Sequence, residues 1–271
     1  PRTSGDGAAA LFVAYPTTGL EEAATPRLVH RLRDDVVPRE AGGARVFIGG
    51  PNAGTIDFSD SVSARLPWLI AVVVGLSLVL LLVFVRSVAI ALKAAVMNLL
   101  SIAAAYGVLT AIVQWGWLGH WLGFPTGMPV TPWVPLFMFP ILFGLSTDYE
   151  VFLISRIREE YDLGAETRVA VTRGLARTAR VITAAAAIMV CVFLSVLLVG
   201  QIDVKEVGLG LGVAVLIDAT IVRMVLVPAV MELLGRANWW LPGWLARILP
   251  VAEPSAAAPV AARPHAETLG G

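Results

Sequence analysis

The chain has 271 residues, of which 57% are hydrophobic and only 15% are charged, and its mean hydropathy is +0.79. Soluble domains contain about 45–50% apolar and about 25% charged residues, so this composition predicts an integral membrane protein. The formal net charge is zero, which argues against a general nucleic-acid-binding surface. The single cysteine, Cys191, excludes an intrachain disulfide.

Residues 1–66 differ in character from the rest of the chain. The short apolar runs 9–15 and 45–48 are typical of strands, and residues 27–37 have helical spacing before Pro38. We therefore predict a strand–helix–strand unit, part of a small α/β subdomain, followed by a polar linker that ends at the membrane near Leu66-Pro67-Trp68. The chain begins with proline and has no signal peptide, so we expect a fragment of a longer protein.

Five apolar segments are long enough to span a bilayer, which takes about 20 helical residues. They cover residues 68–85, 88–113, 133–155, 181–199 and 207–230. The fold class is therefore mainly α, a polytopic helix bundle over residues 67–235. Residues 236–271 are expected to form a short interfacial helix, marked by three tryptophans, and then a disordered tail rich in alanine and proline.

Orientation follows from the lysine and arginine residues in the short loops, because basic loops stay in the cytoplasm. Residues 156–180 hold six arginines, and Arg86 and the segment after Gly235 are also basic. The loop 114–132 has no basic lysine or arginine side chain. We predict that this loop and the α/β region lie outside and that the C-terminus lies in the cytoplasm of a plasma-membrane protein.

Asp148 and Tyr149 are the first candidates for chemistry, because both stand inside the third apolar segment. A charge at that depth costs at least about 2.5–3.5 kcal/mol, so such residues usually face a bundle interior or a wet cavity. A carboxylate there could load and release a proton. Asp148 shares a helix face with Gly144 and Ser155. The alternative is a structural hydrogen bond between helices.

Other polar residues in the spans have less defined roles. Glu150 points away from Asp148 on a helix and is expected to pair with an arginine or lysine. Asp218 and Arg223 are five residues apart, which places them on different stripes of an α-helix, and Arg223 could extend to the interface. Asp218, Lys93 and Arg223 remain candidates for the relay or for a counter-charge to Asp148, with structural roles as the alternative.

Metal and nucleotide chemistry find no support in the sequence. Three scattered histidines and one cysteine give no zinc spacing, and no phosphate-binding G-x-x-x-x-G-K-[ST] motif is present. The glycine-rich run 208–212 lies in an apolar segment, which predicts close helix packing.

The run GLSTDYEVFLISRIREEY at residues 144–161 resembles the signature of the MMPL transporters of the RND superfamily. The runs LKAAVMNLLS at 92–101 and DATIVR at 218–223 are similar to that family too, and the resemblance covers most of residues 8–249. It implies twelve spans in two similar halves, each with an extracytoplasmic porter domain. This chain would be the end of the second porter domain and the last five spans, and the other half would hold a second Asp-Tyr pair.

The resemblance implies a proton-driven exporter of lipids or other hydrophobic cargo, not an enzyme, with Asp148 and Tyr149 as half of a proton relay. It suggests no cofactor; the partners would be membrane lipids, protons, the cargo and the N-terminal half, and no nucleic acid. One alternative is a sensor or scaffold of the same fold, similar to sterol-sensing proteins. An intramembrane aspartyl protease using Asp148 and Asp218 is a further alternative. It would need Tyr before Asp and a Gly-x-Gly-Asp motif, whereas Asp148 precedes its tyrosine and Asp218 follows leucine and isoleucine.

Overall fold

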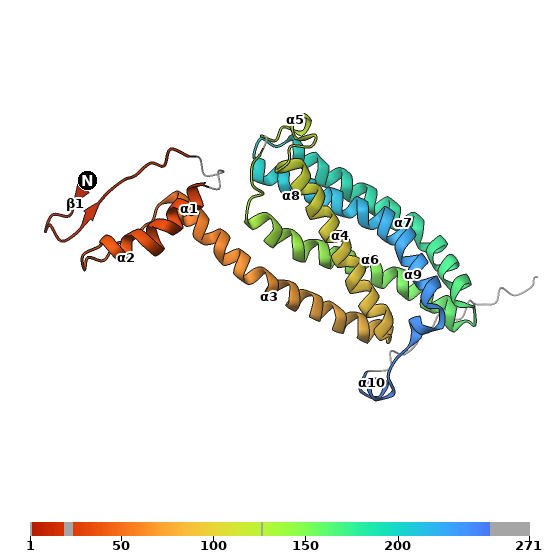
Figure 1. Ribbon diagram of the computed structural model, residues 1–271. Helices are drawn as coiled ribbons and strands as arrows, with labels where there is room; N and C mark the ends of the chain where they lie inside the picture. The colour runs from red at the N-terminus through yellow and green to blue at the C-terminus, as the bar shows by residue number, and fades with distance from the viewer. Residues whose placement is uncertain (1, 19–23, 126, 250–271) are drawn as a thin grey trace, which may run out of the picture.

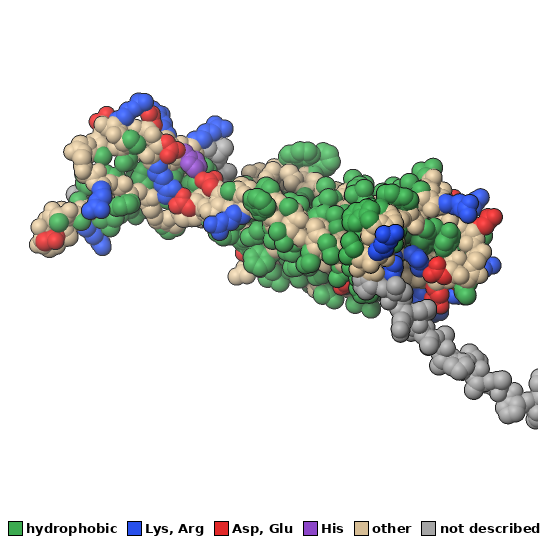
Figure 2. Space-filling model, turned by 90° about the horizontal axis from the view of Figure 1, so that it is seen from below, with side chains coloured by type: hydrophobic (Ala, Val, Ile, Leu, Met, Phe, Trp, Pro, Cys, Tyr) green, Lys and Arg blue, Asp and Glu red, His purple; other side chains and the backbone are tan. Residues whose placement is uncertain are grey.

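The computed structural model describes residues 2–18, 24–125 and 127–249. A helical bundle forms its main body, and one long helix connects the bundle to a smaller N-terminal region (Figure 1). Five helices are long and apolar enough to cross a membrane. Seen from below in Figure 2, hydrophobic side chains cover the middle of the molecule and charged side chains gather at both ends. This pattern fits a multi-pass membrane protein, as the composition predicted.

The N-terminal region contains two short antiparallel strands, β1 (Arg2–Thr3) and β2 (Ala10–Leu11), rather than a strand–helix–strand unit. The predicted strand at 9–15 pairs only at Ala10–Leu11, and residues 45–48 form no strand. The apolar side chains of these two segments are exposed, which explains why the prediction failed. A stable strand pairs with a neighbouring strand and packs its apolar side chains against other residues. Phe12, Tyr15 and Phe47 are 74%, 87% and 89% exposed.

The predicted helix is longer than its proline suggested. It runs as α1 (Ala24–Arg31), a π-helical turn η1 (Leu32–Val36) and α2 (Val37–Glu40). Pro38 lies inside it, directly after the π-helical turn, where the wider ladder of hydrogen bonds accommodates a residue without an N–H. Arg33 donates to both carboxylate oxygens of Asp57, and this contact raises the pKa of the Arg33 guanidinium.

Helix α3 (Pro51–Val85) is 35 residues long and replaces the predicted polar linker. Pro51 occupies the first helical turn, after Gly50 with a φ of 108°. Pro67 lies inside the helix, so residues 66 and 67, the predicted boundary between extramembrane region and bundle, belong to one element. At 1.5 Å per residue α3 is roughly 50 Å long, enough to cross the bilayer and extend well beyond it.

The remaining helices form the bundle, except α10, which projects from it (Figure 1). In chain order they are α4 (Val88–Val113), α5 (Gly119–Leu122), α6 (Trp133–Asp162), α7 (Thr167–Ser195), the 3₁₀ turn η2 (Val196–Leu198), α8 (Ile202–Ile217), the π-helix η3 (Asp218–Leu226), α9 (Val227–Leu234), the 3₁₀ turn η4 (Gly235–Trp239) and α10 (Gly243–Ile248). Residues 88–113 match the second predicted span. Helix α10 lies where the interfacial helix was expected, whereas most of the tail lies outside the described residues.

The arginine-rich segment between the third and fourth spans is mostly helical. Helix α6 continues to Asp162 and α7 already begins at Thr167, so only a short turn connects them. Ion pairs hold these charged ends together, because Glu160 is buried between Arg173 and Arg177. Helix α6 therefore continues past the apolar segment 133–155, and α7 begins before the apolar segment 181–199.

The glycine-rich run packs as predicted. A Cβ atom on Gly210 would lie 2.2 Å from Cε of Met138, and one on Gly208 would lie 2.7 Å from the carbonyl oxygen of Phe193. These distances are shorter than any ordinary contact. Glycine therefore allows α8 to approach α6 and α7 closely, as in other membrane bundles.

Candidate functional site

Asp148 lies on the outward face of α6. Its carboxylate is exposed, and it makes no hydrogen bond or ion pair with any residue that the structure describes. Gly144, Phe152 and Ser155 are exposed on the same face, as the helical spacing predicted. A strip of apolar and small residues with one carboxylate in its middle is thus left uncovered by the described chain.

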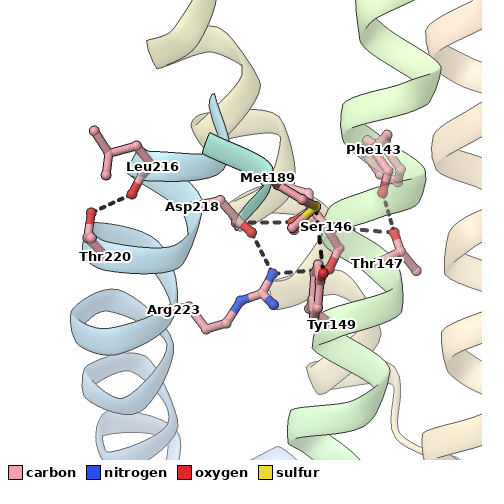
Figure 3. A network of polar contacts seen from close by, with 10 residues as sticks. Phe143, Ser146, Thr147, Tyr149, Met189, Leu216, Asp218, Thr220 and Arg223 are labelled. Carbon is pink, nitrogen blue, oxygen red and sulfur yellow. Dashed lines mark hydrogen bonds and ion pairs between the residues drawn. The ribbon is translucent and has the colours of Figure 1, made fainter. Parts of the chain in front are cut away.

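Tyr149, the next residue, points into the bundle. Its ring lies under the guanidinium of Arg223, with 5.1 Å between Cζ and the ring centroid, and its hydroxyl is 3.7 Å from Sδ of Met189 (Figure 3). The two residues of the Asp-Tyr pair therefore face different surroundings. Tyr149 contributes to the interior, and Asp148 does not.

Asp218 and Arg223 form an ion pair, with 2.5 Å between Arg223 Nη2 and Asp218 Oδ2; Arg223 is buried and Asp218 is partly buried. The prediction that they lie on different stripes was wrong because residues 218–226 form a π-helix. Its hydrogen bonds run from residue i to i+5, so side chains five apart come together. Arg223 is only 3% exposed, and it does not extend to the interface.

Arg223 and Asp218 both contact Ser146 of α6, which joins the two helices. Arg223 Nη2 donates to the backbone carbonyl of Ser146 at 3.2 Å, and the Ser146 hydroxyl lies 3.0 Å from Asp218 Oδ1 (Figure 3). The same hydroxyl is 2.7 Å from Asn98 Oδ1. Because a hydroxyl carries one proton, it donates to only one of these oxygens at a time.

Asn98 extends this network toward α3. Its amide donates to the Thr147 hydroxyl at 3.4 Å, and that hydroxyl lies 3.2 Å from Ser77 Oγ. A chain of polar side chains thus crosses the bundle from α3 through α6 and α4 to η3. The small hydroxyls of Ser77, Ser146 and Thr147 also let the helices approach one another.

A second buried ion pair joins α4 and α6. Lys93 Nζ lies 3.9 Å from Glu150 Oε1, and these side chains are only 3% and 5% exposed. The prediction that Glu150 pairs with a basic residue is confirmed. Lys93 lies on the inward face of α4, beside Glu150.

Glu150 lines the same small pocket as Asp218 and Arg223, and Asn98 also lines it. A larger pocket of about 400 Å³, counted to its open mouth, lies on the other side of Asp218 and Arg223 and is walled mainly by apolar side chains and Tyr149. Within the described ranges, no group of three metal-ligating side chains could hold an ion.

The tertiary structure therefore groups Lys93, Asp218, Arg223 and Tyr149 and leaves Asp148 apart. Sequence reasoning missed Ser146 as a connecting residue. It also missed Glu206, a fully buried acid near the start of α8 that accepts a hydrogen bond from the Thr131 backbone N–H at 2.9 Å. A glutamate at the fifth position of an apolar helix was a readable signal, but its burial depends on how the loop folds over it.

Comparison with known proteins identifies the family of the chain. The sequence matches the MMPL family over residues 2–264. The chain belongs to the MMPL family. It is 44% identical over 250 residues to the Heme uptake protein MmpL11 of Mycobacterium tuberculosis and 42% identical over 250 residues to the Mycolic acid-containing lipids exporter MmpL11 of Mycolicibacterium smegmatis. Each alignment covers 92% of this chain and 26% of the relative.

The Trehalose monomycolate exporter MmpL3 of Mycobacterium tuberculosis is 39% identical over 206 residues, which are 76% of this chain and 22% of that protein. The chain thus spans about a quarter of the length of the curated relatives that it matches. Their names describe transport or export rather than catalysis. The names also differ in cargo, heme for one and lipids for the others, so similarity in this segment does not identify a cargo.

Proposed function

We propose that this chain is the C-terminal part of a proton-motive-force-driven exporter of lipids or other hydrophobic compounds, with Asp148 and Tyr149 in its intramembrane proton relay. Membership of the MMPL family and the names of its relatives support transport as the function. The position of Asp148 supports the proton relay. Protonation of Asp148 would neutralise its charge and allow the facing helices to repack.

One observation carries the proposal: Asp148 is a carboxylate at membrane depth with no partner in the described chain. An ionised carboxylate against lipid would be costly, so its surroundings in the whole protein must supply water, a polar group or a proton. Asp218 and Glu150, the other acids in the middle of the bundle, each have a basic residue beside them, whereas Asp148 is open to a partner from elsewhere. The uncovered strip on α6 is where the other half of the protein would pack.

The proposed orientation places the N-terminal region and loop 114–132 outside the cell and the C-terminus in the cytoplasm. The distribution of arginine supports it, because the charged ends of α6 and α7 and the link at Arg86 lie at one end of the bundle. Protons would then enter from the end where α5 lies.

The test is Asp148→Asn in the full-length protein. Purified protein in liposomes that enclose a pH-sensitive dye reports proton flux under an imposed gradient, and cells carrying the variant report lipid export. We expect both signals to fall to the protein-free or gene-deletion background in Asp148→Asn and to be retained at least in part in Asp148→Glu. Wild-type flux and export in Asp148→Asn would refute the relay.

Asp162→Asn is the matched control. Asp162 also lies on α6 and is exposed, but it pairs with Arg158 at 3.3 Å near the helix end. We expect this variant to transport normally. The alternative function is a sensor or scaffold of the same fold. It predicts that even the wild-type protein shows no proton flux, and that the rest of the protein has no second Asp-Tyr pair.

A further inference from the structure

The segment that follows the last span is fixed to the link between α3 and α4. The Ser87 hydroxyl donates to the backbone carbonyl of Asn238, and the Val88 N–H donates to the carbonyl of Trp240 at 3.3 Å. Asn238 is fully buried, and its side-chain amide donates to the Met231 carbonyl at 2.6 Å. These hydrogen bonds give η4 a defined path along the end of the bundle, and they fix the point from which α10 starts.

Helix α10 lies beside the point where α3 leaves the membrane. It projects from the bundle, and its Ala246 carbonyl accepts a hydrogen bond from Arg86 Nη2 at 3.1 Å (Figure 1). Arg86 follows directly after Val85, the last residue of the apolar part of α3. Only 17% of that apolar part is buried, so lipid must cover most of it. A charged residue at the end of such a run marks the edge of the hydrocarbon layer, and α10 is therefore held at this edge.

Large apolar side chains are exposed at every fourth position of this segment. Trp240, Trp244 and Ile248 are 58%, 66% and 71% exposed. Trp244 and Ile248 are one helical turn apart in α10, and Trp240 lies just before the helix. Tryptophan is enriched where lipid headgroups meet hydrocarbon, because its ring is apolar and its N–H is polar. The segment is thus suited to lie in the headgroup region of a membrane.

Two arginines of the same segment have no acidic partner. Arg236 and Arg247 are exposed, and neither forms an ion pair with any residue in the part of the chain that the structure describes. Other arginines at this end of the bundle are neutralised by acids: Arg156 by Glu159, Arg158 by Asp162 and Arg168 by Glu232. A guanidinium group binds phosphate through two parallel hydrogen bonds, so these two arginines complement a lipid phosphate.

We propose that η4 and α10 bind anionic phospholipids of the adjoining membrane leaflet. Arg236 and Arg247 hold the lipid phosphates, and Trp244 and Ile248 lie among the upper carbons of the acyl chains. Amphipathic helices of this kind lie about 5–10 Å deep in the interface. Because η4 is fixed to the link between α3 and α4, the bound lipid holds the end of the last span against the end of α3.

The experiment identifies the lipid that lies at α10. The full-length protein carrying Ile248→p-benzoylphenylalanine, a photoreactive side chain, is reconstituted in vesicles of equal parts phosphatidylglycerol and phosphatidylcholine. After illumination, mass spectrometry of the α10 peptide measures the ratio of the two lipid adducts. One basic residue near an anionic surface contributes about 1 kcal/mol, which is about fivefold in a binding constant. We expect phosphatidylglycerol to dominate, and its excess to fall by up to about 30-fold in Arg236→Gln/Arg247→Gln.

Arg180→Gln is the matched control. Arg180 is also exposed and has no ion pair within the described residues, but it lies on α7. It should leave the adduct ratio unchanged, and Arg247→Lys, which keeps the charge, should retain most of the excess. The proposal is overturned if position 248 cross-links to protein instead of lipid, if the two lipids react equally in the wild type, or if Arg180→Gln lowers the ratio as much as the double variant.

This measurement does not depend on transport. Loss of proton flux in Asp148→Asn would leave the lipid adducts unchanged, and normal flux would not restore a missing excess of phosphatidylglycerol. The two proposals therefore fail separately.

Discussion

The ion pair between Asp218 and Arg223 allows a quantitative prediction. Replacing Arg223 by methionine keeps a flexible side chain of similar length but removes the charge. Asp218 would then keep only the Ser146 hydroxyl as a donor, and the cation–π contact with Tyr149 would be lost. Removing one partner of a buried ion pair destabilises a protein by about 3–5 kcal/mol, because the other charge remains buried. We expect Arg223→Met to lower the free energy of unfolding by that amount.

The double variant Asp218→Asn/Arg223→Met separates the charge from the packing. The double variant leaves no buried charge, and its asparagine can still contact Ser146. It should therefore recover most of the unfolding free energy that Arg223→Met loses. Arg223→Lys keeps the charge, but its shorter side chain does not reach the position of Nη2, which donates to both Asp218 and the Ser146 carbonyl. This variant should lose about 1–3 kcal/mol of unfolding free energy. Reversible unfolding of the full-length protein in mixed micelles, followed by tryptophan fluorescence, measures all three.

Two results would contradict this reasoning. Arg223→Met could unfold within about 0.5 kcal/mol of the wild type, the range typical of surface substitutions. Alternatively, the double variant could lose as much unfolding free energy as the two single variants lose together. Either result would mean that Asp218 is not held as a charge by Arg223.

Further predictions concern packing and capping, measured by the same unfolding assay. Gly210→Ala should cost about 1–3 kcal/mol because the new Cβ would overlap the buried Met138 side chain, whereas Gly107→Ala, whose Cβ meets nothing within 4 Å, should be neutral or stabilising. A Gly210→Ala variant as stable as the wild type would contradict the close packing. Ser87→Ala should cost about 1–2 kcal/mol, because the Ser87 hydroxyl accepts from the Ile90 N–H at 3.2 Å and donates to the Asn238 carbonyl. A loss of unfolding free energy no larger than that for removing a helix cap, typically about 1 kcal/mol, would show that the contact with Asn238 contributes nothing.

Much of the fold could be read from hydropathy, because a membrane span needs a long apolar run and leaves few alternatives. Residues 88–113 were predicted to the residue. The errors lie where helices leave the hydrocarbon. Helix α3 begins at Pro51 and α7 at Thr167, far before their apolar parts, since charged helical turns outside a membrane have no hydropathy signal.

The candidate site was predictable in its members but not in its contacts. Asp148 was expected to take its partner from the other half of the protein, and this stays a prediction. Glu150 was expected to pair with a basic residue, and Lys93 is that residue. The pairing of Asp218 with Arg223 was missed, because spacing rules assume α-helical geometry and this segment is π-helical.

The sequence by itself determined that the chain crosses a membrane, that its spans contain a few costly charges, and that Asp148 and Glu150 point to different sides of one helix. These properties follow from composition and from the fixed rise and turn of a helix. Only the tertiary structure decided which charges meet. Partner choice depends on the register between neighbouring helices, and here the glycines of α8 and the π-helical turn of η3 set that register. Those two features bring Arg223 to Ser146 and Asp218, whereas Glu150 forms its ion pair with Lys93 of α4.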